Sequence, residues 1–183
     1  MIVGAVGAVA GIGVFSAFSA TTSNDNNSFA SGTVVIGDND SGTQTLYVVS
    51  NAAPSTASTA ECIKVTYTGS LPANVRLYRS GFTGGSGLDS YVDLSVIKGT
   101  GNNFNCSDFS GSTQVYGPAA TLNSFPTTWA GASNLTNGSG SATWSNGDSV
   151  TYKFQATLDS ATPNTQQNKT TGTHSFTWEA DNT

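Results

Sequence analysis

The chain has 183 residues, enough for one domain with a buried core or for one domain plus a short N-terminal appendage. Only 9% of the residues are charged, against about 25% in an average soluble domain, and Ser, Thr, Asn and 21 Gly fill the deficit. The net charge of -5 and the lack of a basic cluster exclude the electrostatic signature of a nucleic-acid-binding protein. This composition is typical of secreted or cell-surface β proteins, because short polar side chains suit many strands joined by loops.

Residues 1–20, MIVGAVGAVAGIGVFSAFSA, carry no charge and are mostly apolar or Gly. The apolar run has the length of a signal-peptide core, and the small residues around Ser16 fit cleavage there, which would make 1–16 a removed leader. The basic stretch that opens a typical signal peptide is missing. Because four glycines weaken a helix that is already short, no stable membrane span is expected in the mature protein. If residues 1–16 are not removed, the segment would be an assembly element, either a strand buried in a neighbouring subunit or a pilin-like helix.

From residue 29 onward, apolar and polar side chains alternate with the period of half-buried strands. The clearest case is residues 149–158, SVTYKFQATL, with one face predicted to meet the core and the other to meet solvent. Residues 173–180, THSFTWEA, repeat the pattern and put His174 on the apolar side. A lone histidine there is more often a hydrogen-bonded core or rim residue than a ligand. Further strands are predicted at 29–36, 44–50, 61–68, 73–79 and 90–97.

These strands predict that residues 29–183 form one antiparallel β-sandwich domain, preceded by an assembly segment at 1–28. Residues 99–147 are rich in Gly, Asn and Ser and are interpreted as an insertion that contains short edge strands near 112–116 and 140–144. Cys62 and Cys106 are an even pair in a chain with other signs of export, which favours one disulfide. That bridge would tie the start of the insertion to the sandwich.

No catalytic residue, metal site or cofactor is predicted. His174 is the single histidine, and the sequence has no HExxH or CxxC spacing and no supported Ser-His-Asp arrangement. Residues 38–42, DNDSG, are similar to the start of a calcium loop, but Val49 stands where the closing carboxylate would be. A turn is therefore the favoured interpretation of this segment.

Three segments, in this order along the chain, resemble the TasA/camelysin family of biofilm-matrix fibre proteins that signal peptidase processes. They are AFSATTSNDNNSFASGTVVIG at 17–37, ECIKVTYTGSLPANVRLY at 61–78 and VTYKFQATLDSATPNTQQNKTTGTHSFTWEA at 150–180. The resemblance implies a jelly-roll-like sandwich, secreted to the cell surface or medium, without enzymatic activity. It also implies a homopolymeric fibre in which each subunit inserts its N-terminal strand into the next, with other matrix components as further partners.

An extended segment of about ten residues spans roughly 33 Å, and it can pair with an open sheet edge while alternate side chains fill a groove. If cleavage follows Ser16, the donor would be the rather polar segment 17–28; if the leader stays, the apolar residues 2–16 would contribute. The residues expected in the assembly strand are Val14, Phe15, Ala17, Phe18, Ala20 and Thr22.

Two other functions stay open on the sequence. A pilin-like filament subunit with a helical N-terminus keeps the same functional class, although the glycines of that segment count against a helix. A secreted carbohydrate-binding or adhesin module is the alternative from another class, motivated by Tyr116, Trp129 and Trp144 in a loop-rich region.

Overall fold

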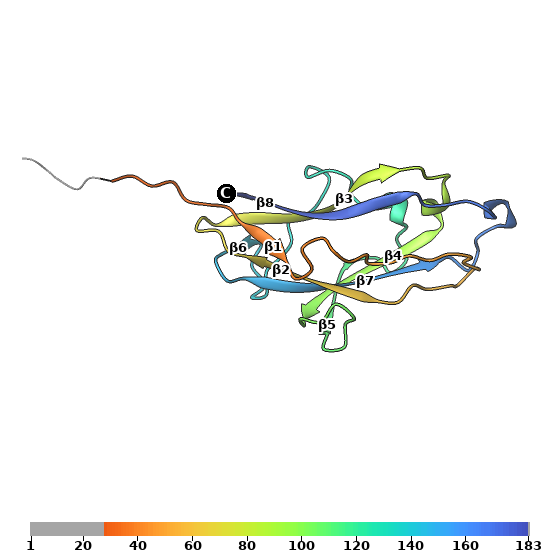
Figure 1. Ribbon diagram of the computed structural model, residues 1–183, viewed down its shortest axis with the longest axis horizontal. Coiled ribbons are helices and arrows are strands. Elements are labelled where there is room, and N and C mark those ends of the chain that lie inside the picture. The colour runs from red at the N-terminus through yellow and green to blue at the C-terminus, as the bar shows by residue number, and fades with distance from the viewer. Residues whose placement is uncertain (1–27, 183) are drawn as a thin grey trace, which may run out of the picture. The chain divides into compact units, whose positions relative to one another are not determined.

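The computed structural model of the protein describes residues 28–182. The chain divides into two units, Met1–Ser31 and Gly32–Thr183, and the second contains all the strands described below. The residues expected in the assembly strand, from Val14 to Thr22, lie outside the described range. Figure 1 shows the strands, which are β1 (Ile36–Asp38), β2 (Glu61–Tyr67), β3 (Ala73–Thr83), β4 (Val92–Thr100), β5 (Ser110–Tyr116), β6 (Thr143–Trp144), β7 (Ser149–Leu158) and β8 (Thr173–Asn182).

The strands form two antiparallel sheets, which confirms the predicted all-β sandwich. One sheet has five strands in the order β1-β2-β7-β4-β5, and the other has three in the order β6-β3-β8. The helical elements within residues 28–182 are three short 3-10 turns, η1 (Leu88–Ser90), η2 (Leu122–Ser124) and η3 (Asn164–Gln166). No helix in this part of the chain is long and apolar enough to cross a membrane.

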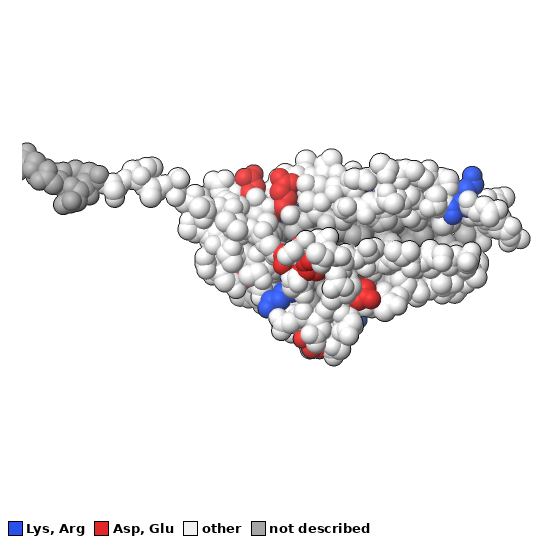
Figure 2. All heavy atoms as spheres, in the orientation of Figure 1, with Lys and Arg blue, Asp and Glu red and all other residues white. Residues whose placement is uncertain are grey.

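The core lies between the inner faces of the two sheets. All five inward positions predicted for β7 are buried, from Val150 to Leu158 in steps of two. Trp144 on β6 is fully buried, and its Nε1 donates a hydrogen bond of 2.9 Å to the Leu135 carbonyl, so the indole is both packed and satisfied. Charged side chains are sparse over the visible face of the sandwich, as the composition requires (Figure 2).

The outer face of β7 is covered in part: Gln155 is exposed as predicted, but the prediction that this whole face meets solvent is wrong at Thr151. Thr151 is buried, and its Oγ1 donates to the Gly101 carbonyl at 2.6 Å. The Lys153 ammonium lies over the Phe109 ring, 5.1 Å from its centroid. The loop at 101–109, between β4 and β5, therefore forms an extra layer outside the five-stranded sheet.

The predicted disulfide between Cys62 and Cys106 is confirmed, with the two Cα atoms 5.2 Å apart. The backbone N–H of Cys62 also donates to the Phe104 carbonyl at 2.6 Å. Together these bonds anchor the 101–109 loop to β2, next to β7.

Seven of the predicted strand segments form ladders near their expected bounds, and the two that precede β2 do not. The segments at 61–68, 73–79, 90–97, 112–116, 140–144, 149–158 and 173–180 correspond to β2, β3, β4, β5, β6, β7 and β8. Of 29–36, only Ile36 belongs to a strand, and residues 44–50 form no ladder. Residues 44–50 run along the open side of the sandwich and have no strand beside them to pair with (Figure 1). Thr33 and Val35 of the other segment accept hydrogen bonds from Leu71 and Thr68, in the turn after β2.

Candidate functional site

The candidate site begins with an unpaired strand edge. β8 pairs with β3 along one side, from Asn182 opposite Ala73 to Ser175 opposite Ser80. Along its other side, β8 has no ladder partner within residues 28–182. A free edge of ten residues offers a row of backbone donors and acceptors to another extended segment.

The inward-facing row of β8 is only half covered. His174, Phe176 and Trp178 are each half-buried, although they point toward the core as the alternation predicted. The Phe176 ring lies 4.8 Å from that of Phe154 and 5.4 Å from that of Phe125. β8 therefore presents aromatic rings that stay half-buried within residues 28–182, although the Tyr47 ring lies 6.4 Å from that of Phe176.

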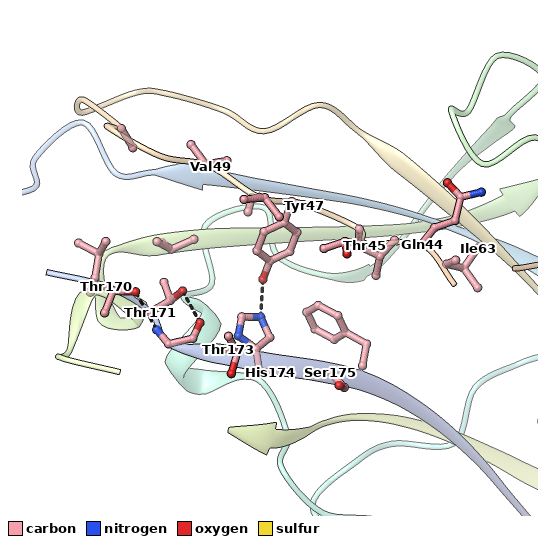
Figure 3. Close-up of a pocket in the computed structure, with 18 of the residues that line it drawn as sticks. Gln44, Thr45, Tyr47, Val49, Ile63, Thr170, Thr171, Thr173, His174 and Ser175 are labelled. Atoms are coloured by element: carbon pink, nitrogen blue, oxygen red, sulfur yellow. Dashed lines mark hydrogen bonds between the residues drawn. The ribbon is translucent and has the colours of Figure 1, made fainter. Parts of the chain in front are cut away.

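A groove runs along this aromatic row, between β8 and the chain segment that leads into β2 (Figure 3). Its volume is about 670 Å³. A second hollow of about 210 Å³ lies against Phe176 and Trp178 together with Ile36 and Val65. Apolar side chains that line the main groove include Leu46, Val49, Ile63, Leu158, Phe176 and Trp178.

The segment at residues 43–52, which we name the strap, crosses the groove without joining a sheet. Between Thr45 and Ala52 its backbone makes no hydrogen bond to any residue of 28–182. Its one hydrogen bond over this stretch joins the Tyr47 hydroxyl to His174 Nε2 at 2.6 Å. The interpretation of His174 as a hydrogen-bonded rim residue is confirmed, whereas Tyr47 was not identified from the sequence because 44–50 was expected to be a strand.

Two buried polar atoms of the groove have no partner within residues 28–182. They are Trp178 Nε1 and His174 Nδ1. Buried donors are almost always hydrogen-bonded in folded proteins, so an unpartnered one in a groove indicates a place for an acceptor. A backbone carbonyl of an extended peptide has the right chemistry for the indole N–H.

The aromatic residues considered for glycan binding do not form an open platform. Trp144 is fully buried, and Tyr116 packs edge-on against Phe125 at 4.6 Å between ring centroids. The guanidinium of Arg76 lies over the Trp129 ring, 4.6 Å from its centroid. Stacking of a sugar on the covered face of Trp129 would first require displacement of Arg76.

Residues 38–42 form the predicted turn. The Asp38 carboxylate accepts hydrogen bonds from the backbone N–H groups of Asp40 and Ser41, and Asp40 accepts from Gly42 and Gln44. Burial and a hydrogen bond to Asp40 raise the pKa of Asp38. No group of three His, Cys, Asp or Glu side chains in the part of the chain that the structure describes converges on a metal position. These carboxylates therefore serve the turn.

Comparison with models of protein families and with curated proteins gives no match. Within residues 28–182, the open edge of β8 and the groove beside it form the candidate site.

Proposed function

We propose that this protein is a secreted structural subunit that polymerises into an extracellular filament of the biofilm-matrix kind, by donating its N-terminal strand to the next subunit. The observation that carries the proposal is the ten-residue free edge of β8 beside an apolar groove. The proposal involves no catalytic step, cofactor or metal. It keeps self-association as the principal interaction.

The geometry suits an added strand. A partner of about ten residues would match β8 over roughly 33 Å and bond to its free backbone groups. Alternate side chains of that partner would enter the groove and cover the half-buried rings of Phe176 and Trp178. Full burial of one apolar side chain contributes about 1.5–3 kcal/mol, so a few such side chains would supply most of the affinity.

The donor is assigned to the N-terminal segment on its sequence. If the leader is removed after Ser16, Phe18, Ala20 and Thr22 form the row that enters the groove. If it is retained, Val14 and the apolar residues before it extend that row. Both versions put the joint between the N-terminus of one subunit and β8 of its neighbour.

Intermolecular disulfide trapping tests this joint directly. The sequence has two cysteines and both are in the disulfide, so an engineered thiol is unique in each molecule. We expect a mixture of the Ser19→Cys and Ser175→Cys proteins to form a cross-linked heterodimer under mild oxidation, because Ser175 is exposed on β8 itself and Ser19 alternates with Phe18 along the donor. The matched control is Ser112→Cys, which is exposed on β5 at the far edge of the other sheet.

Equal trapping at Ser112 and Ser175 would contradict the assignment of the β8 edge as acceptor. Electron microscopy of protein lacking residues 1–28 provides the second test, with a urea titration to check that the sandwich stays folded. We expect no fibres from the folded, truncated protein. Fibres of normal appearance would refute donation by the N-terminal segment.

A further inference from the structure

The strap occupies the side of the sandwich where β8 lacks a neighbour, yet it is weakly attached. Leu46 and Tyr47 are half-buried against the core, whereas Val48 is 84% exposed. The hydrogen bond between Tyr47 and His174 is the one polar contact from Thr45–Ala52 to the rest of residues 28–182. Residues 45–52 pack through Leu46 and Tyr47 but make no backbone hydrogen bond to residues 28–182, so they can leave the surface without breaking the ladders of either sheet.

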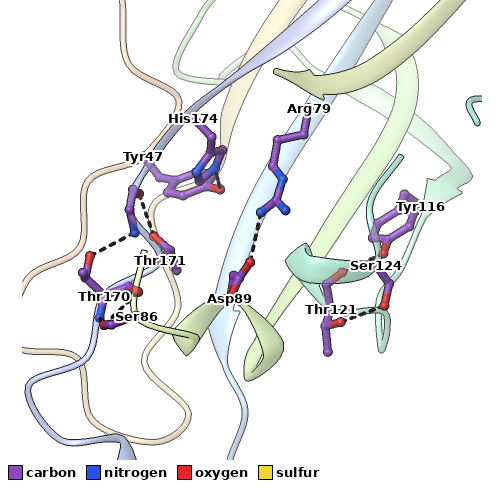
Figure 4. Close-up of polar contacts among 11 residues, drawn as sticks. Tyr47, Arg79, Ser86, Asp89, Tyr116, Thr121, Ser124, Thr170, Thr171 and His174 are labelled. Atoms are coloured by element: carbon purple, nitrogen blue, oxygen red, sulfur yellow. Dashed lines mark hydrogen bonds and ion pairs between the residues drawn. The ribbon is translucent and has the colours of Figure 1, made fainter. Parts of the chain in front are cut away.

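His174 sits beside a buried pair of charges (Figure 4). Arg79 on β3 and Asp89 on η1 are both buried, and Arg79 Nη1 lies 3.3 Å from Asp89 Oδ2. Burial lowers the pKa of His174, and the Arg79 guanidinium lowers it further, while the Gly172 backbone and Asp89 oppose the change. Burial raises the pKa of Tyr47, so its hydroxyl keeps its proton. The other charged residues that line the groove are Asp38, Asp40 and Lys169.

We propose that the strap is a displaceable cover of the strand-acceptor groove, fastened through Tyr47 to neutral His174 and released when acid protonates that histidine. The strap would then regulate the same groove that the proposed function uses, and its biological role rests on that function. The acid-dependent release of the strap does not depend on the proposed function, because the strap opens within a single molecule.

The direction of the pH effect follows from the surroundings of His174 in the two states. With the strap closed, the ring is half-buried near Arg79 and stays neutral. With the strap open, water reaches the ring and relieves its burial, so the pKa of His174 rises toward its ordinary value of 6.5. The open state therefore binds more protons, and opening becomes more favourable as the pH falls below about 6.5. One proton allows a change of at most about tenfold for each pH unit.

Thiol labelling of the strap measures this opening. In the full chain, Leu46→Cys places a thiol at the half-buried position, and Val48→Cys places one at the exposed position two residues away. The ratio of their labelling rates with a disulfide reagent cancels the pH dependence of the thiol itself. At protein concentrations too low for fibres, we expect this ratio to rise several-fold from pH 7.5 to pH 5.5.

Two substitutions separate the roles of the fastening and the charge. His174→Gln cannot be protonated, so the labelling ratio should no longer change with pH. Tyr47→Phe removes the hydrogen bond but keeps the titrating ring, so it should raise the ratio at both pH values and preserve the pH response. The proton NMR signal of His174, the single histidine of the chain, gives an independent pKa that should lie below 6.5 in the wild type.

A labelling ratio that does not change with pH in the wild type, or that changes equally in His174→Gln, would overturn the proposed release. Fibre assembly measured on the same proteins distinguishes this failure from failure of the proposed function. Fibres without acid opening would refute the strap mechanism alone. Acid opening without fibres or trapping at Ser175 would refute the acceptor role of the groove and leave the strap mechanism standing.

Discussion

Loss of the disulfide between Cys62 and Cys106 is expected to destabilise the fold by about 4 kcal/mol. The bridge joins residues 44 apart in sequence. Closing a loop of this length removes about 13 cal/mol/K of entropy from the unfolded chain, which is about 4 kcal/mol at 25 °C. The native state also loses the anchor of the 101–109 loop, whose Gly101 carbonyl accepts the hydrogen bond of buried Thr151.

A urea titration monitored by tryptophan fluorescence measures the free energy of unfolding of Cys62→Ala/Cys106→Ala and of the wild type. Both proteins are kept below the concentration at which fibres form. Reduced wild type is the matched control, because it loses the same cross-link but keeps both sulfur atoms. Similar losses in the two proteins would assign the effect to the cross-link, whereas a larger loss in the double variant would measure packing around buried Cys62. A loss under about 1 kcal/mol in both would refute the entropic argument and indicate that the unfolded chain is already compact near these residues.

Two further predictions concern the core and the buried charges. Phe154→Ala should lower the free energy of unfolding by about 3–5 kcal/mol, because this fully buried ring packs against Phe176 and Trp178. A urea titration measures the loss, and a value under about 1 kcal/mol would contradict this packing. Asp89→Asn should cost about 3–5 kcal/mol by leaving Arg79 buried without its counter-ion, whereas Arg79→Met/Asp89→Leu should recover most of that loss. A double variant as unstable as the single one would show that the pair itself stabilises the fold.

The strands that the sequence predicts well are those with one face buried against the opposite sheet. In β7 and β8, the two-residue alternation of the sequence matches the alternation of side chains in the sandwich, because each strand has one neighbouring sheet to contact. The pairing of Cys62 with Cys106 could be predicted for a simpler reason, since two cysteines allow one intramolecular disulfide.

The strap could not be predicted because a strand needs a hydrogen-bonding neighbour as well as strand-forming residues. Residues 44–50 are rich in strand-forming side chains, yet burial there does not alternate: Leu46 and Tyr47 are both half-buried, and Val48 and Val49 are both exposed. The covered face of β7 was missed for a related reason. Only the folded arrangement brings the 101–109 loop over Thr151.

The four sheet edges formed by residues 28–182 differ in a way that bears on the proposed joint. β1 and β6 are short, with three and two residues, and the pairing of β5 with β4 is interrupted by two register shifts. Short strands and bulges are the means by which β proteins prevent edge-to-edge association. β8, by contrast, pairs regularly with β3 from Asn182 to Ser175 and leaves a long edge free.

Protection of the β8 edge therefore depends on the strap, which covers the groove without bonding to the β8 backbone. A cover of this kind opposes association only while it stays in place. A strand from another subunit that displaced it would gain the backbone bonds that the strap does not make. Of the edges that the structure describes, β8 is thus the one where a donated strand would require the least rearrangement of the two sheets.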